Sequence, residues 1–167
     1  MCTRSRLHPE ATGRARIRIM NRLIALAASL ALMGADATAH GDATATIVIE
    51  VSTFRNMRGL LGCQLYNSSV GFPDKWPTDP SFNKRVPVSG TTTTCTFPNM
   101  APGTYAAAVI HDENSNGKLD TNVLGMPTEG YGISNNHTHA LRRPTWDESK
   151  LVVNGGTTVT TRVSLRY

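Results

Sequence analysis

The sequence is poor in several features, and each shortage excludes a class of protein. Only 6% of its 167 residues are aromatic and 17% are charged. Its lysines and arginines form no basic stripe interleaved with aromatic side chains, which argues against a nucleic-acid-binding surface. No internal repeat, low-complexity block or amphipathic helical pattern is present. The main apolar run, residues 23–32, is too short to span a membrane.

Residues 1–39 resemble an upstream extension followed by a secretory leader. Residues 1–19 are basic and lack periodicity, and Met20 opens a second start with a positive flank. The apolar run 23–32 and an A-x-A site ending at Ala39 complete the three parts of an export signal. We therefore expect translation to start at Met20 and cleavage after Ala39. An N-terminal membrane anchor is the alternative.

Removal of this leader changes the charge of the chain. The whole sequence carries 17 basic and 12 acidic residues, of which residues 1–39 hold six and two, so 11 and 10 remain. The basic isoelectric point thus belongs to the leader and indicates no acidic partner. Residues 40–167 have the length of one domain with one core.

Two cysteines, Cys63 and Cys95, remain after the leader is removed. An even pair in an exported chain predicts a disulfide. Both cysteines also fall on the apolar faces of predicted strands, which agrees with that pairing. Two buried free thiols are the alternative.

Alternation of apolar and polar residues dominates the rest of the chain. It predicts strands at residues 44–52, 61–65, 86–88, 91–97, 104–110, 151–153 and 159–167. The apolar run 104–110 is typical of a central strand that is covered on both faces. We expect an all-β fold, an antiparallel β-sandwich of about seven strands of immunoglobulin- or transthyretin-like type. One long irregular loop, residues 112–149, interrupts it.

The segment HDENSNGKLD, residues 111–120, carries the most specific chemistry. Oxygen-bearing side chains recur at alternate positions, with Gly117 sixth from the first of them, as in the front part of a calcium loop. Ca²⁺ prefers oxygen ligands. The expected ligands are Asp112, Asn114 and Asn116 by their side chains, Lys118 by its carbonyl, and Asp120 directly or through water.

This loop departs from a complete EF-hand. Position twelve, where the bidentate glutamate belongs, is Val123. Glu129 could fold back to supply a carboxylate, whereas Glu113 falls between ligand positions and is expected to be solvated. The low charge predicts weak binding, at or above about 10⁻⁴–10⁻³ M. The metal-free alternative is a network of Asx-turns in which Asp112 and Asn116 bind backbone amides.

Residues 102–136, PGTYAAAVIHDENSNGKLDTNVLGMPTEGYGISNN, resemble the signature of the bacterial DUF2141 family. The resemblance covers about residues 45–167, including LYNSSVGFP at 65–73, the cysteine pair, the Pro144 region and the last strand. Ser115 stands where many members carry glycine. The resemblance implies an exported, β-rich domain without an established activity. The motif is also similar to calcium loops in sandwich modules of bacterial surface adhesins.

Other residues suggest weaker alternatives. Cleavage after Ala39 would expose His40, whose amine and imidazole bind copper, with His111 or the pair His137 and His139 completing the site. Ser134 and His137 suggest a hydrolase, but no nucleophile-elbow motif surrounds the serine.

Three aromatic residues could line a sugar or peptide groove: Tyr131, Trp76 and Trp146. For Trp146, however, a lid over the core is the preferred interpretation.

Taken together, these patterns favour an exported binding or accessory module, in the periplasm or at the cell surface, rather than an enzyme. Its expected cofactor is Ca²⁺, and its expected partner is a protein or envelope component. No nucleic acid is expected, and no transmembrane segment should remain after cleavage.

Overall fold

A computed structural model describes residues 43–167 except Trp76, Thr138, Ala140 and Leu141. The chain divides into two units, residues 1–39 and residues 40–167, and every described residue belongs to the second. The predictions for the leader and for His40 lie outside the described residues. Among the described residues, no helix is long and apolar enough to cross a membrane.

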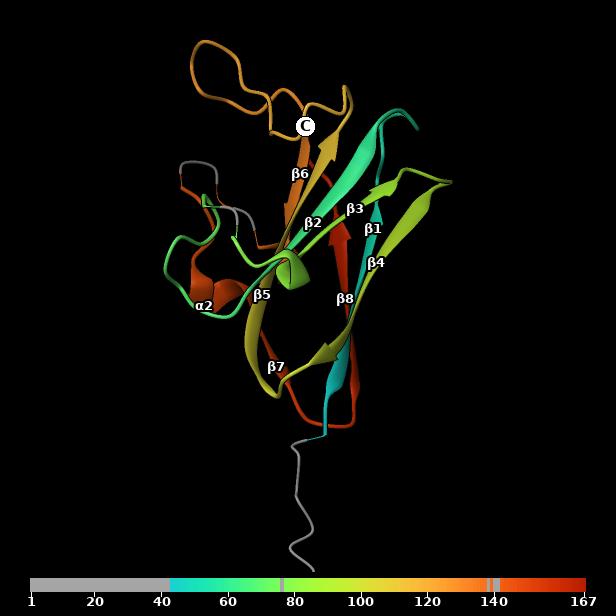
Figure 1. Ribbon diagram of the computed structural model, residues 1–167. Helices are drawn as coiled ribbons and strands as arrows, with labels where there is room; N and C mark the ends of the chain where they lie inside the picture. The colour runs from blue at the N-terminus through green and yellow to red at the C-terminus, as the bar shows by residue number, and fades with distance from the viewer. Residues whose placement is uncertain (1–42, 76, 138, 140–141) are drawn as a thin grey trace, which may run out of the picture. The chain divides into compact units, whose positions relative to one another are not determined.

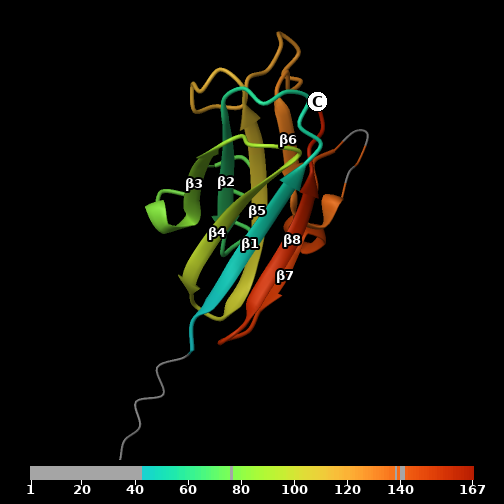
Figure 2. The same ribbon diagram turned by 90° about the vertical axis from the view of Figure 1, so that its right-hand side faces the viewer.

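The first layer is a three-stranded sheet with the order β4-β1-β8 (Figure 2). Its strands are β1 (Ala45–Ser52), β4 (Thr92–Met100) and β8 (Thr158–Ser164). Alternate residues of β1 are fully buried, as the period of two predicted. One expectation was wrong: β1 pairs with β4 antiparallel, but with β8 in parallel. β1 ends at Ser52 and β8 begins only at Thr158, so no tight hairpin forces the two strands into opposite directions.

The second layer is a five-stranded sheet built around β5, which is central as predicted (Figure 1). Its strands are β2 (Leu60–Tyr66), β3 (Asn83–Pro87), β5 (Gly103–Asp112), β6 (Gly130–Ile133) and β7 (Lys150–Val153). β2 lies along one edge of β5. β6 and β7 share the other edge, because β7 pairs with the first half of β5 and β6 with the second.

A single apolar core lies between the two sheets. Both sheets contribute fully buried side chains to it, including Ile47, Ile49 and Phe97 from one and Leu61, Leu65 and Val109 from the other. The Cys63–Cys95 disulfide joins β2 to β4 across this core, with both side chains inaccessible to solvent. The all-β class and the predicted cysteine pairing are therefore confirmed.

The prediction that residues 112–149 lack regular structure was wrong. They contain β6, the 3-10 turn η2 (Ser134–Asn136) and the one-turn helix α2 (Trp146–Ser149); a further 3-10 turn, η1 (Pro80–Phe82), lies elsewhere. A capping box formed by Thr145 and Glu148 starts α2.

β6 has the sequence GYGI, in which the glycines conceal the alternation of apolar and polar side chains. A Cβ at Gly132 would lie 2.4 Å from Val163, so only glycine lets β6 approach β8.

The disulfide should contribute strongly to stability, because it closes a loop with a sequence separation of 32 residues. In the chain-entropy treatment, that loop length corresponds to about 3–4 kcal/mol. We expect the double variant Cys63→Ala/Cys95→Ala to lose about that amount of unfolding free energy in urea titrations. An unchanged urea midpoint under oxidising conditions would contradict this expectation.

Candidate functional site

The Asp/Asn loop, residues 112–120, begins where β5 ends. Asp112 is the last residue of that strand and is only 2% exposed. Its Oδ1 accepts a hydrogen bond from the Asn116 backbone amide at 2.9 Å, and its Oδ2 accepts one from the Gly117 amide at 2.7 Å. Gly117 has a positive φ of 81°, which a glycine adopts without strain. A buried carboxylate thus turns the chain sharply at the strand end.

The amide side chains of this loop converge on Asp120. The Nδ2 groups of Asn114 and Asn116 donate to its carboxylate at 2.7 Å and at 3.0–3.1 Å. Their Oδ1 atoms accept from backbone amides two residues further on, those of Asn116 and Lys118. The predicted side chains are therefore gathered, in the Asx-turn arrangement that the metal-free alternative describes.

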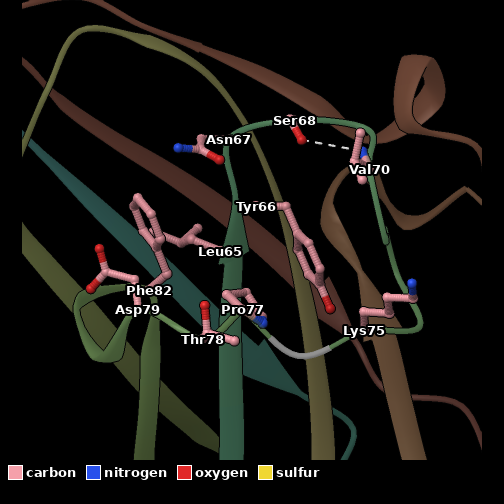
Figure 3. A pocket seen from close by; sticks show the side chains of 10 residues that line it. All are labelled: Leu65, Tyr66, Asn67, Ser68, Val70, Lys75, Pro77, Thr78, Asp79 and Phe82. Atoms are coloured by element: carbon pink, nitrogen blue, oxygen red, sulfur yellow. Dashed lines mark hydrogen bonds between the residues drawn. The ribbon is translucent and has the colours of Figure 1, made fainter.

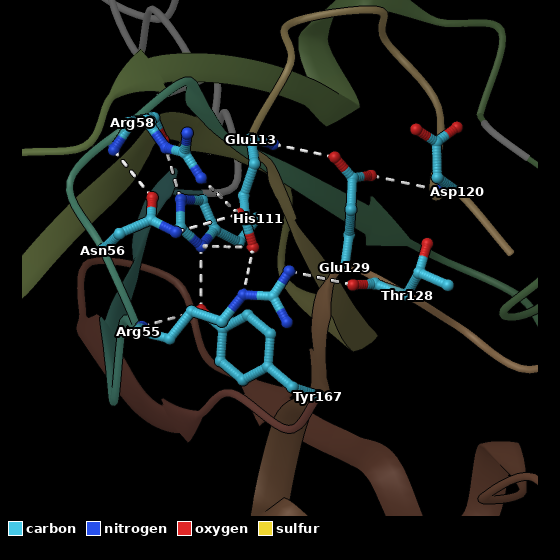
Figure 4. Close-up of polar contacts among 9 residues, drawn as sticks. All are labelled: Arg55, Asn56, Arg58, His111, Glu113, Asp120, Thr128, Glu129 and Tyr167. Atoms are coloured by element: carbon cyan, nitrogen blue, oxygen red, sulfur yellow. Dashed lines mark hydrogen bonds and ion pairs between the residues drawn. The ribbon is translucent and has the colours of Figure 1, made fainter.

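Glu129 returns to the Asp/Asn loop from the far end of the excursion, which we define as residues 112–129. Its side chain is buried, and its two oxygens accept the backbone amides of Glu113 at 2.9 Å and Asp120 at 3.1 Å (Figure 4). Val123, at the twelfth position, is fully exposed. Glu129 is thus the carboxylate that closes the loop, although its role as a ligand stays a prediction.

The chemistry of these groups suits a hard cation better than a soft one. The site contains three carboxylates and two side-chain amides, all of which bind metals through oxygen, and Ca²⁺ takes oxygen ligands. Among the described residues, however, no three His, Cys, Asp or Glu side chains already stand grouped to hold a metal. An ion bound beside Asp120 would take the place of the amide NH₂ groups that now donate to this carboxylate. The two amide side chains would then have to turn so that their oxygens face the ion.

The expectation that Glu113 is solvated was wrong. Its side chain is 11% exposed and pairs with the Arg55 Nε at 2.6 Å, while Asn56 donates to its other oxygen at 2.8 Å (Figure 4). Burial raises the pKa of Glu113, but the hydrogen bonds from Asn56 and Arg55 and the charge of Arg55 outweigh it and lower the pKa overall. Glu113 therefore ties the excursion to the turn between β1 and β2.

His111 lies beneath this ion pair and is fully buried. Its Nε2 lies 2.8 Å from the Arg58 carbonyl oxygen, which only accepts, so Nε2 carries the proton. Its Nδ1 then accepts from the Tyr167 hydroxyl at 2.8 Å, and that hydroxyl accepts from the Arg55 amide. Both ring nitrogens are thus occupied by protein groups, which disfavours the copper role considered for His111.

The outer part of the excursion is an ordered turn. Thr121 and Pro127 form an isolated bridge, and the Asn122 side chain accepts the amides of Leu124 and Met126 at 2.9 and 3.0 Å. This turn exposes three large apolar residues: Val123, Leu124 and Met126. Thr121, Met126 and Pro127 also face the outer surface of the five-stranded sheet.

A cavity of about 530 Å³ lies on that outer surface. The excursion contributes Leu119, Thr121, Met126 and Pro127 to its wall, and the sheet contributes its floor. The segment before α2 supplies arginines at the rim. This volume falls within the range of about 300–1,000 Å³ typical of small-molecule sites.

A second, smaller cavity of about 280 Å³ lies under the crossing between β2 and β3 (Figure 3). Its lining includes Leu65, Tyr66 and Phe82, with Lys75 and Asp79 among its polar groups. Its lining includes part of the stretch 65–73 but no residue that the sequence analysis proposed as a metal ligand or catalytic group.

Ser134, the candidate nucleophile, is fully buried in a structural position. Its hydroxyl accepts the Ala107 amide at 3.0 Å and donates to the Ser149 carbonyl. Ala107 lies between the stretches of β5 that pair with β6 and β7, so this hydroxyl bridges the gap between the two edge strands. This arrangement gives no support to hydrolase chemistry.

The remaining candidates are scattered. His137 is exposed, and His139 binds Glu148 at 2.8 Å. Tyr131 lines the large cavity. Trp146, the first residue of α2, packs edge-on against Phe72 at 5.8 Å and does not belong to the core between the sheets. Trp76 lies outside the described residues.

The fold and site define a two-layered all-β domain with an acidic excursion and an adjoining cavity. The sequence matches the model of one family, described as an uncharacterized protein conserved in bacteria (DUF2141), over residues 49–161. The chain therefore belongs to the DUF2141 family, as its central motif suggested. No curated protein and no solved structure matches it, so the immunoglobulin- or transthyretin-like type stays a prediction.

The position of Ser134 predicts a structural effect of its loss. Ser134→Ala leaves the Ala107 amide and the Ser149 carbonyl without their hydroxyl partner in a buried position. We expect the variant to lose about 1–3 kcal/mol of unfolding free energy, measured by urea titration. Unaltered stability would show that these groups find other partners.

The lowered pKa of Glu113 predicts acid sensitivity. A carboxyl group with a lowered pKa adds stability above its ordinary value of 4.5, and this stability is lost as the pH falls through the lowered pKa of the folded protein. Glu113→Gln should therefore be less stable than the wild type at neutral pH, with the gap shrinking below 4.5. Urea midpoints across pH measure this gap. Glu50→Gln, which removes an exposed pair with Arg162, is the control and should show little change.

Proposed function

We propose that this protein is an exported binding or accessory module of the cell envelope, and that Ca²⁺ holds its excursion in place. The observation that carries this proposal is the double role of residues 112–129. One side of the excursion gathers the Asp/Asn loop and Glu129, and the other side forms a wall of the 530 Å³ cavity. An ion bound on the first side would therefore stabilise the second.

In this proposal, each group of the site has a distinct task. Asp112 is already held by two backbone amides, so it offers its remaining lone pairs in a preorganised position. Asp120 is the carboxylate whose partners are the two asparagine side chains, so it can exchange them for an ion at least cost. Glu129 adds a third negative charge from the opposite end of the excursion. Three charges in an incomplete EF-hand favour weak binding, in the range of about 10⁻⁴–10⁻³ M for extracellular modules.

Export is supported by two independent features of the chain. The leader pattern within residues 1–39 has the three parts of a secretory signal. The core contains a disulfide, and structural disulfides persist in oxidising compartments such as the periplasm. The partner in this proposal is a protein or a component of the envelope. A binding role is favoured over catalysis because Ser134 and His111 both serve to hold main-chain groups.

Thermal melting in the presence of Ca²⁺ tests the ion site. If the dissociation constant is about 1 mM, then about 10 mM Ca²⁺ adds about 1.4 kcal/mol and raises the melting midpoint by roughly 4–6 °C. The shift should grow with the logarithm of the Ca²⁺ concentration. Mg²⁺ at the same concentration should produce a smaller shift, because it dehydrates reluctantly.

Asp120→Asn is the informative variant, since the Asp120 carboxylate accepts only side-chain amides, whereas that of Asp112 holds two backbone amides. It should melt near the wild-type midpoint without Ca²⁺ and lose most of the Ca²⁺-dependent shift. Asp147→Asn removes an exposed carboxylate paired with Lys150 and should keep the full shift. A midpoint that ignores Ca²⁺ in the wild type would exclude the ion site.

A further inference from the structure

We propose that the 530 Å³ cavity binds a small amphipathic carboxylic acid, with its apolar body over the sheet and its carboxylate at the arginine-bearing mouth. The inference deepens the proposed binding role by naming a ligand class. It does not require the calcium site.

The floor of the cavity is apolar and already shielded from water. Tyr105, Ala107 and Val109 of β5 belong to the core between the sheets, so Ala108 and Ile110 face the opposite, outer side. Nevertheless Ala108 is 8% exposed and Ile110 is 7% exposed. This apolar floor, together with the wall that covers it, encloses a space that an apolar group can fill favourably.

One buried side-chain amide at the floor of the cavity uses only one of its two ends in hydrogen bonds within the protein. Gln64 is 3% exposed and lines the cavity, and its side-chain oxygen lies 2.7 Å from the Tyr66 hydroxyl. The same hydroxyl lies 2.9 Å from the Pro73 carbonyl oxygen. A tyrosine has one proton and cannot donate to both acceptors.

Rotation of the Gln64 amide by 180° resolves this conflict. Its NH₂ group then donates to the Tyr66 oxygen, and the tyrosine donates to Pro73. In either orientation, one end of the amide has no hydrogen-bond partner among the described residues, and the side chain lines the cavity. Because this end opens into the cavity rather than being sealed from solvent, a polar group of the ligand can take the place of the water that it would otherwise bind.

The mouth of the cavity offers one readily available guanidinium. Arg142 binds both oxygens of Glu148, whose pKa is lowered well below its usual range, first by that arginine and then by the Thr145 amide. Arg143 instead pairs with Asp74 from the crossing between β2 and β3, and both side chains are largely exposed. Exposed ion pairs contribute little stability, so a ligand carboxylate can share or replace Asp74 at low cost.

Decanoate and decanol, added below their aggregation limits, are suitable probes because they differ only in the charged group. The readout is the amide NMR spectrum of the full mature domain, with the dissociation constant taken from the titration. Decanoate should shift the Gln64 side-chain amide and the backbone signals of Ala108 and Ile133. Decanol should bind the same site at least fivefold more weakly.

Two variants separate the parts of the site. Ala108→Phe fills the floor and should weaken decanoate at least tenfold, and its amide spectrum reports whether it stays folded. Arg143→Gln should reduce decanoate affinity about fivefold and leave decanol unchanged. Arg162→Gln, which removes another largely exposed arginine, on the other sheet, should change the affinity of neither probe.

Absence of decanoate binding, or binding that a folded Ala108→Phe variant retains, would overturn the proposal. Equal affinity for decanol would overturn its carboxylate part. All titrations are run with Ca²⁺ and with a chelator. Decanoate binding in both conditions supports the cavity even if the ion site fails, and an intact Ca²⁺ shift without decanoate binding would leave the proposed ion site standing.

Discussion

The carboxylate of Asp112, buried at the end of β5, is the interaction on which the excursion depends. It satisfies two backbone amides that the sharp turn would otherwise leave unpaired. Glu129, at the other end of the excursion, does the same for the amides of Glu113 and Asp120. Two acidic side chains thus replace the hydrogen bonds that a sheet would have supplied, and they allow a long ordered segment to leave the framework.

That excursion links parts of the domain that are distant in sequence. Glu113 binds Arg55 in the turn after β1, and His111 binds Tyr167 at the end of the chain (Figure 4). On the other side, Leu119, Thr121, Met126 and Pro127 line the cavity on the outer face of the five-stranded sheet. A structural change in the Asp/Asn loop can therefore alter the cavity wall, because the same excursion, held by hydrogen bonds at both ends, contains both.

Sequence periodicity predicted most strands because one face of each is buried and the other is not. It missed β6, where glycines occupy the inward positions and leave no apolar pattern to detect. It also misjudged Glu113, whose burial depends on Arg55 and Asn56 from another part of the chain. The parallel pairing of β1 with β8 was equally hidden, because strand direction across a sheet depends on the whole topology.

The sequence by itself determined the all-β class, the cysteine pair and the residues of the Asp/Asn loop, because these follow from local alternation and spacing, and its central motif indicated the family by resemblance. Only the tertiary structure decided that Glu129 closes this loop, that Ser134 joins two edge strands and that a cavity lies beside the excursion. Each of these depends on side chains brought together across long stretches of chain. Their contacts are set by how the sheets pack, which no local pattern records.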